Sequence, residues 1–323
     1  MNDKKLKKPT APLDLFHSDV FLVGRYFCDL VYSGLPEFPK LGHEVYSSDC
    51  RIIPGGVYTP AVTLQRLGLK IVWPCTFGTD PFSQYVKVQA LRNNIPGDWF
   101  KDTDLPSLRI TTVFSFDDER AFISYVDPMP SYAYSKLIVT TRPRWIYLTY
   151  LLVGRELDEI HSAAHSVGTK IYMDCQAHNH GIQEKAVQDA LRLVDVFSPN
   201  RAESNALCGT DQIAAIMRDL GKFARVVLVK DGMNGCYFCE NNETTHVPGI
   251  KTDVVDTTGA GDNFNCGYLY GAINGFDAAQ SLLLANICGG LSVQGIGGSS
   301  QEISENKLKE IFERFSIRRE LSD

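Results

Sequence analysis

The chain has 323 residues, of which 44% are hydrophobic and 22% charged, and this globular composition excludes a disordered protein. The net charge of −6 provides no basic field for a nucleic-acid backbone, so we expect neither DNA nor RNA as a partner. Residues 1–8 lack the apolar stretch of a secretory signal, and the apolar runs are too short to cross a membrane. Nine cysteines, an odd number spread along the chain, indicate a reduced, cytoplasmic protein.

Short apolar runs alternate with helical patterns along most of the chain. In chain order the expected elements are a strand (20–23), a helix (60–67), a strand (71–73), a helix (81–92), a strand (145–148), a helix (156–166), a strand (171–173), a helix (183–191), a strand (194–197), a helix (211–222), a strand (225–229) and a last helix around 308–315. Alternation at this spacing predicts a mainly parallel sheet with helices on both faces.

Two segments interrupt the alternation. Residues 28–53 contain extended pieces at 30–33 and 44–47 without a helix, and residues 109–116 and 120–126 form a predicted hairpin. We expect these strands to form a small separate sheet that projects over one edge of the main body as a lid. The predicted organisation is one domain over residues 10–320, with lid segments at about 28–53 and 108–127 and a flexible tail over residues 1–9.

The segment 252–271 carries the strongest chemical signal, because it predicts a strand, a glycine-bearing turn and a helix. Gly259 and Gly261 allow a close approach to the backbone, and the N–H groups that open the helix favour an anion above the turn. Asp262 beside such a site suggests a general base that takes a proton from an attacking hydroxyl. The alternative is that Asp262 only caps the helix. Asp256, at the end of the expected strand, favours the catalytic interpretation.

The run 256–262 resembles the carboxy-terminal motif of the ribokinase-like (PfkB) carbohydrate kinases. Further matches occur in the order of the family, from about residue 24 to residue 298. They are Gly55-Gly56 with the helix that follows, the turn at 78–82, the Asn-x-x-Glu element at 200–203, the glycine loop at 230–235, and the closing segments at 285–286 and 291–294. The family resemblance implies a three-layer α/β/α fold with a small β lid.

The resemblance implies an enzyme that transfers the γ-phosphoryl group of ATP to a hydroxyl of a small sugar or sugar derivative. In the family pattern, Asp262 is the catalytic base. The amides that form the anion hole are those of Gly259, Ala260 and Gly261. The acceptor-binding residues implied in the same way are Asp29, Gly55, Gly56, Thr59 and Asp262.

The resemblance also implies ATP, Mg²⁺ and, as in many members, a monovalent cation such as K⁺. Asn200 and Glu203 would hold Mg²⁺ through water, which suits an ion that keeps part of its hydration shell. The nucleotide-binding residues would be Asn200, Lys230, Gly232, Gly235, Gly261 and Asn286. The K⁺ site would be formed by Asp256 and by backbone carbonyls near Thr258, Ser292, Gly295 and Gly297.

The acceptor stays open, because Thr59 stands where the family usually has an asparagine and its loop is one residue shorter. A sugar kinase is favoured over a nucleoside kinase of the same family and over a catalytically slow binding protein on this fold. A dinucleotide-dependent oxidoreductase would need a Gly-x-Gly-x-x-Gly turn after the first strand, which the sequence does not contain. Lid strands of many relatives pair across a dimer, and an exposed β edge here would favour a homodimer.

Other clusters of polar residues are interpreted as structural. Cys236 and Cys239 lie three apart in a strand and face opposite sides, which favours core cysteines over a metal or redox pair. His178 and His180 favour a loop or pocket wall over a metal site. Arg120 on the hairpin favours a salt bridge with its acidic neighbours over contact with an anionic acceptor.

Overall fold

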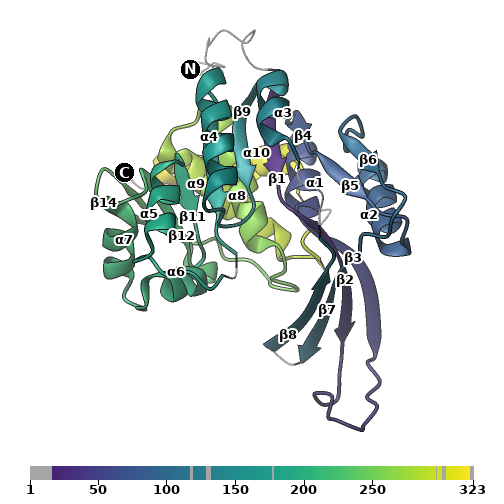
Figure 1. Cartoon of the computed structure of the whole chain (residues 1–323). Coiled ribbons are helices and arrows are strands. Elements are labelled where there is room, and N and C mark those ends of the chain that lie inside the picture. Colours follow the sequence, from purple (N-terminus) through teal and green to yellow (C-terminus); the bar gives the residue numbers. More distant parts are fainter. Residues whose placement is uncertain are drawn as a thin grey trace.

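An eight-stranded sheet forms the centre of the molecule, and Figure 1 shows helices on both of its faces. The computed structural model describes residues 17–116, 119–128, 132–176, 178–295, 297–299 and 303–320. The strand order is β14-β13-β12-β11-β10-β9-β1-β4, parallel from β4 to β12 and antiparallel beyond. The strands are β1 (Ser18–Val23), β4 (Ile71–Val72), β9 (Pro143–Leu148), β10 (Lys170–Asp174), β11 (Val196–Ser198), β12 (Val226–Lys230), β13 (Cys236–Glu240) and β14 (Glu243–Val247). The predicted mainly parallel sheet is confirmed.

The two faces of this sheet bury separate apolar clusters, because successive residues of a strand point to opposite sides. In β1, Val20 and Leu22 belong to one cluster and Phe21 and Val23 to the other. The helices over the first face are α1 (Tyr58–Arg66), α2 (Pro81–Arg92), α8 (Ala260–Ile273), α9 (Ala278–Ser292) and α10 (Glu305–Glu320). Those over the second are α3 (Tyr134–Thr141), α4 (Arg155–Val167), α5 (Lys185–Arg192), α6 (Arg201–Cys208) and α7 (Ile213–Gly221).

A four-stranded sheet projects from one edge of the main body, as Figure 1 shows. We call it the lid sheet. Its strands, in spatial order, are β3 (Asp49–Gly56), β2 (Tyr26–Ser33), β7 (Arg109–Phe116) and β8 (Glu119–Val126). The hairpin of β7 and β8 was predicted, and the two strands pair antiparallel over their full length. A separate two-stranded sheet joins β5 (Cys75–Phe77) to β6 (Phe100–Asp102).

Two strand predictions are wrong. Residues 44–47 are not a strand, because β2 ends at Ser33 opposite Asp49, so the intervening segment lies beyond the last available partner. Residues 252–255 are also not a strand. The N–H groups of Val255 and Asp256 both donate to the carbonyl of Val293, at 2.7 and 3.1 Å, so this segment is held against the end of α9 instead of a sheet.

Every other expected strand and helix of the main body is present within a few residues of its predicted bounds. The helices and strands that were not predicted are α3, α9, β3, β5, β6 and β14, and of α6 only the start was predicted. Residues 1–16, which include the predicted tail, lie outside the described residues. None of the helices in the described part of the chain has the length and apolar character needed to span a membrane.

Candidate active site

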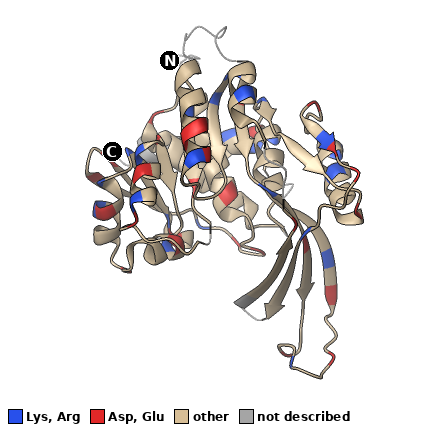
Figure 2. Cartoon of the chain, viewed as in Figure 1, with Lys and Arg blue, Asp and Glu red and all other residues tan. Residues whose placement is uncertain are grey.

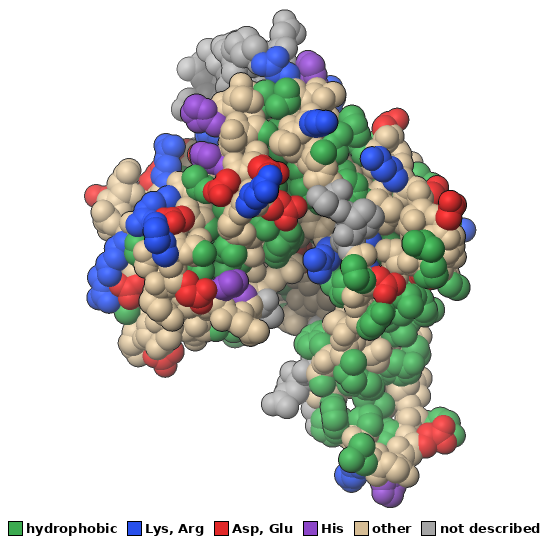
Figure 3. Space-filling model, viewed as in Figure 1, with side chains coloured by type: hydrophobic (Ala, Val, Ile, Leu, Met, Phe, Trp, Pro, Cys, Tyr) green, Lys and Arg blue, Asp and Glu red, His purple; other side chains and the backbone are tan. Residues whose placement is uncertain are grey.

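A cleft of about 400 Å³ lies between the lid sheet and the main body, and Figure 3 shows the hollow where the two meet. It brings together Asp29 of β2 and Asp262 of α8, which are far apart in the sequence. The predicted acceptor-binding residues all line this cleft. The described residues around it are Phe27, Asp29, Val31, Ile53, Pro54, Gly55, Gly56, Thr59, Thr111, Val113, Phe122, Ser124, Gln176, Glu203, Asp256, Thr258, Gly259, Asp262, Gly297 and Gly298.

The lid sheet turns one face toward the cleft, and Asp29 lies at its centre. Asp29 pairs in register with Thr111 of β7, and the Oγ1 of Thr111 lies 3.0 Å from the Oγ of Ser124 on β8. Burial raises the pKa of Asp29 to about 7, although a hydrogen bond with Thr111 opposes the shift. A Cβ on Gly55 would lie 2.3 Å from the Oδ2 of Asp29, so a side chain at this position would displace the Asp29 carboxylate. We call Asp29, Thr111 and Ser124 the polar row.

A second row on the same face lies one step farther from the main body. Val31 pairs with Val113, which in turn pairs with Phe122. Val113 is buried, whereas Phe122 is 62% exposed and faces the open cleft. We call these residues the apolar row. The sequence prediction included Asp29 but missed both rows as a surface, although the two-residue period of the hairpin was available as a signal.

Thr59 joins the lid end of the cleft to the start of α8. It is buried in the first turn of α1, and its side chain packs against the backbone of Gly259 and Gly298. A Cβ on Gly298 would lie 2.9 Å from the Oγ1 of Thr59. Gly56 has a φ of 61°, and a Cβ there would lie 2.3 Å from the carbonyl of Arg25. Thr59 therefore borders the acceptor side of the cleft and the glycine turn together.

The turn before α8 depends on Gly259, which has a φ of 72°. A Cβ at this position would lie 2.5 Å from the Cα of Gly298, so a side chain would displace backbone. α8 begins directly after it, and its first turn includes Asp262. The N–H of Ala260 donates to the carbonyl of Thr257 at 3.2 Å, so this predicted anion-hole amide is already engaged in the turn.

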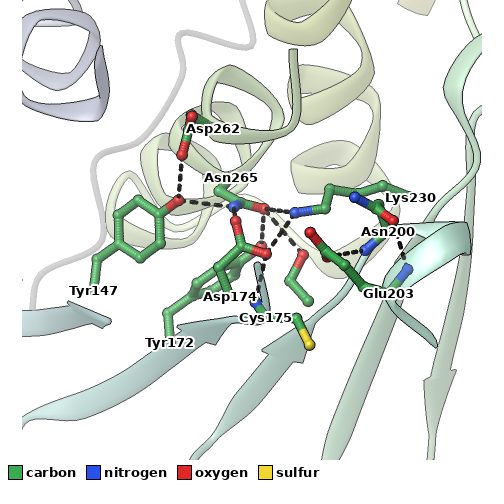
Figure 4. Close-up of polar contacts among 10 residues, drawn as sticks. Tyr147, Tyr172, Asp174, Cys175, Asn200, Glu203, Lys230, Asp262 and Asn265 are labelled. Carbon is green, nitrogen blue, oxygen red and sulfur yellow. Dashed lines mark hydrogen bonds and ion pairs between the residues drawn. The ribbon is translucent and has the colours of Figure 1, made fainter. Parts of the chain in front are cut away.

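Asp262 lies at the edge of a cluster of ionisable side chains, as Figure 4 shows. The hydroxyl of Tyr147 on β9 donates to its Oδ1 at 3.4 Å. Burial, together with the charge of Asp174 on β10, raises the pKa of Asp262 to about 7. Lys230 and the Tyr147 hydrogen bond oppose this shift, whereas Glu203 adds to it. The carboxyl group can therefore exchange a proton near neutral pH.

Lys230 lies beneath the first turn of α8, and not in the glycine loop where the sequence prediction grouped it. Its Nζ is 2.7 Å from the Oδ1 of Asp174, and both side chains are less than a tenth exposed. A Cβ on Gly261 would lie 3.4 Å from this Nζ. Burial alone would lower the pKa of Lys230, but the carboxylates of Asp174 and Glu203 raise it. The cation is therefore held permanently charged under the predicted anion site.

Asn200 and Glu203, the predicted Mg²⁺ residues, form the capping box that starts α6. The N–H of Glu203 donates to the Oδ1 of Asn200 at 2.9 Å, and the N–H of Asn200 donates to the Oε2 of Glu203 at 2.7 Å. Glu203 also lines the cleft, and burial raises its pKa. This role in starting α6 is compatible with the predicted metal-holding role, because each oxygen keeps further lone pairs.

The remaining predicted nucleotide residues gather at a second place, next to the end of β14. Gly232 and Gly235 flank the tight turn between β12 and β13. A Cβ on Gly235 would lie 2.1 Å from the carbonyl of Val247, and the Nδ2 of Asn286 donates to the carbonyl of Pro248 at 3.1 Å. Asn200, Lys230 and Gly261 are instead neighbours at the start of α8, so the structure divides the predicted nucleotide set into two groups.

Asp256 connects the glycine turn to the loop after α9. Its Oδ1 accepts from the N–H of Thr258 at 2.8 Å, and its Oδ2 accepts from the N–H of Gly297 at 2.9 Å. Ser292 is buried at the end of α9, and Gly295 follows in the bend. The Asp256 carboxylate thus joins the backbone of the glycine turn to that of the loop after α9. These two segments contain the residues of the predicted K⁺ site.

Of the residues interpreted as structural, Cys236, Cys239, His178 and His180 are not part of the cleft lining. Cys236 and Cys239 are buried in the apolar clusters of opposite faces of the central sheet. His180 lies 2.8 Å from a carboxylate oxygen of Glu184. Within the described ranges, no group of three or more His, Cys, Asp or Glu residues is arranged to hold a metal. The side chain of Arg120 lies outside the described residues.

Comparison with known proteins agrees with this arrangement. The family model described as pfkB family carbohydrate kinase matches residues 37–305. An uncharacterized sugar kinase of Archaeoglobus fulgidus is 28% identical over 72% of this chain and 95% of its own length. A ribokinase of Bacillus subtilis is 22% identical over 91% of this chain and 99% of its own. The structure of Arabidopsis thaliana ribokinase complexed with ribose and ATP covers 91% of this chain and 98% of its own, with a TM-score of 0.77 and 20% identity. The chain belongs to the pfkB family of carbohydrate kinases.

Proposed function

We propose that this protein transfers the γ-phosphoryl group of ATP to a hydroxyl of an uncharged sugar or sugar derivative, with Asp262 as the general base. The observation that carries the proposal is the position of Asp262. Asp262 lies in the first turn of α8 and lines the same cleft as the polar row of the lid. The pKa of its carboxyl group is about 7. A base of this pKa is ionised often enough at neutral pH and still accepts a proton readily.

The reaction forms a bond between the acceptor oxygen and the γ-phosphorus. It breaks the bond from that phosphorus to the oxygen that bridges to the β-phosphate, and ADP leaves. The acceptor hydroxyl loses its proton in this exchange, and the carboxylate of Asp262 takes it. The first turn of α8 and the buried ammonium of Lys230 stabilise negative charge next to this carboxylate.

Glu203 is the residue best placed to hold Mg²⁺, since it lines the cleft and is fixed by Asn200. One carboxylate with one amide oxygen suits an ion that keeps most of its water shell. When bound, Mg²⁺ would neutralise charge on the phosphates. A K⁺ ion beside Asp256 is also part of the proposal, because backbone carbonyls of the loop after α9 lie near the glycine turn.

The lining of the cleft supports an uncharged acceptor. None of the described residues around it is Lys or Arg, whereas its carboxylates are Asp29, Glu203, Asp256 and Asp262. These carboxylates oppose the binding of a second anion, the acceptor, beside them. The polar row offers hydroxyl and carboxylate groups to a sugar, and the apolar row beyond it offers a surface without hydrogen-bonding groups.

The apolar row also favours a second candidate, a nucleoside kinase of the same family. A ribose bound at the polar row would direct an attached base toward Val113 and Phe122. Phe122 is the natural stacking partner there, because its ring is exposed in the cleft. Phe122→Ala should then raise KM for nucleosides more than KM for free sugars.

The protein would act in the cytoplasm and pair through the lid. All nine cysteines are free, which suits a reducing compartment. The outer face of the lid sheet exposes Ile52, Ile123 and Tyr125, at 47%, 65% and 58%. In Figure 2 the charged residues of the body have both signs, whereas β2 and β7 are almost uncharged. Light scattering at several concentrations tests the expected homodimer.

A coupled assay of ADP release tests the proposed activity directly. The panel consists of ribose, fructose, inosine and adenosine as neutral acceptors and 2-keto-3-deoxygluconate as an anionic one. We expect turnover with at least one neutral acceptor and background rates with the anion. A preference for the anion would contradict the uncharged-acceptor part, and background rates throughout would contradict the phosphoryl-transfer proposal.

A further inference from the structure

A buried network of polar side chains lies directly beneath Asp262. Figure 4 shows Tyr147, Tyr172 and Asp174 reaching up from adjacent strands toward Asn265 on α8. Asn265 is fully buried and bonds to all three. Buried polar groups of this kind are costly unless every partner is satisfied. The direction of each hydrogen bond can therefore be worked out from its neighbours.

The amide of Asn265 can adopt only one orientation. Its Oδ1 accepts from the ammonium of Lys230 at 3.4 Å and from the hydroxyl of Tyr172 at 2.7 Å. Its Nδ2 donates to the Oδ2 of Asp174 at 2.6 Å and to the hydroxyl oxygen of Tyr147 at 2.8 Å. Because an ammonium only donates and a carboxylate only accepts, swapping the amide atoms would break both contacts.

This orientation determines where the proton of Tyr147 points. The phenol oxygen accepts from Asn265, so its own hydrogen is directed to the Oδ1 of Asp262 at 3.4 Å. Burial keeps the pKa of Tyr147 well above its usual value of 10, so the phenol remains a donor at neutral pH. The bond is long for an O–H···O contact, and such contacts commonly shorten when substrate binds.

We propose that Tyr147 is a positioning residue for the base. Its hydroxyl holds one oxygen of the Asp262 carboxylate in a fixed direction and leaves the other to take the acceptor proton. This inference rests on the proposed function. A hydrogen bond donated to a carboxylate favours its ionised form, so Tyr147 also keeps Asp262 ready to act as a base.

Other charged groups near Asp262 also shift its pKa. Glu203 of α6 and Asp174 of β10 disfavour its ionised form, and Lys230 of β12 favours it. Asp29 of the lid and Asp256 of the glycine turn line the same cleft. The hydroxyl of Tyr147 is uncharged. Its removal therefore takes away a hydrogen bond to Asp262 and leaves every neighbouring charged residue in place.

The chain contains a matched control for Tyr147, namely Tyr172. Both rings are buried and lie 5.5 Å apart edge to face, and both hydroxyls bond to Asn265. The hydroxyl of Tyr172 bonds to the opposite end of the amide, so only that of Tyr147 donates to Asp262. Tyr147→Phe and Tyr172→Phe therefore remove the same group from the same network with different consequences.

The experiment measures kcat, both KM values and the pH profile for each variant. We expect Tyr147→Phe to lower kcat about tenfold, with the KM for ATP nearly unchanged and the acid limb of the profile moved to higher pH. Tyr172→Phe should keep kcat within about twofold and leave the acid limb in place. Equal effects of the two substitutions, or an unmoved acid limb in Tyr147→Phe, would overturn the proposal.

Asp262→Asn in the same assays separates this inference from the proposed function. If Asp262→Asn retains full turnover, Asp262 is not the base and the proposed mechanism fails. If Asp262→Asn is inactive while Tyr147→Phe behaves like Tyr172→Phe, only the role of Tyr147 fails. Thermal melts of both Phe variants test whether each folds, which separates loss of function from unfolding.

Discussion

Replacing Lys230 with Met removes the cation that neutralises the carboxylates beneath α8. Its Nζ lies 2.7 Å from Asp174, and the two side chains are 9% and 7% exposed. Methionine keeps most of the length of the side chain, so the principal loss is the charge. The carboxylates of Asp174 and Glu203 would then share a buried site with no compensating cation.

The expected loss of stability follows from the burial of the Lys230–Asp174 pair. Removing one partner of a buried ion pair costs about 3–5 kcal/mol, because the remaining charge is left without compensation. Total stabilities of folded domains are about 5–15 kcal/mol, so this is a large fraction. Lys87 offers a control, because it pairs with Asp102 at the same 2.7 Å but the side chains are 24% and 61% exposed. Lys87→Met should cost less than about 1 kcal/mol.

Urea unfolding followed by circular dichroism measures both variants. The free energy of unfolding should fall several-fold more in Lys230→Met than in Lys87→Met. The double variant with Asp174→Asn should recover part of the loss, since it removes the uncompensated charge. Equal small losses in both lysine variants would refute the argument that the Lys230 pair is buried and coupled.

Three further predictions concern the cleft. The rate of phosphoryl transfer should rise with pH through about 7, because Asp262 has its pKa raised to about 7 and must be ionised to act; a flat profile from pH 5.5 to 8 would contradict this. Asp29→Asn should raise the melting temperature at pH 8 and change it little at pH 4, because the pKa of Asp29 is about 7 in the fold against an ordinary value of 3.8, so its stability cost grows between these two pH values and is complete above pH 7; an equal change at both pH values would contradict this. Glu203→Gln should raise the Mg²⁺ concentration needed for half-maximal turnover, and an unchanged Mg²⁺ titration would mean that this residue only starts α6.

The alternating part of the fold could be predicted from sequence because its elements carry clear periods. β1 and β9 are apolar runs of a parallel sheet, and α4 and α5 have one apolar face. α9 could not be found in this way, since it is buried on nearly all sides and shows no helical period. The strand expected at 252–255 failed for a related reason. The backbone N–H groups of Val255 and Asp256 donate to the carbonyl of Val293 at the end of α9, a contact that no local pattern encodes.

Only the parts of the site that are marked by residues close together in the sequence could be predicted. Gly259 and Asp262 are local, and the structure places both at the opening of α8. The position of Lys230 was not foreseen, because its ion pair with Asp174 joins residues 56 apart in the sequence. Tyr147 was missed for the same reason. It reads as a core tyrosine of a parallel strand, and its contact with Asp262 exists only once α8 packs on β9.

Turnover of Asp262→Asn tests the central claim most directly. The amide is nearly isosteric with the carboxylic acid but cannot take the acceptor proton at neutral pH. The variant is assayed for ADP release with the best neutral acceptor of the panel, beside a measurement of ATP binding. Removal of a positioned base should lower kcat by about 10²–10⁴ while ATP binding persists. Turnover within a few-fold of the unmodified protein would contradict the assignment of Asp262 as the base.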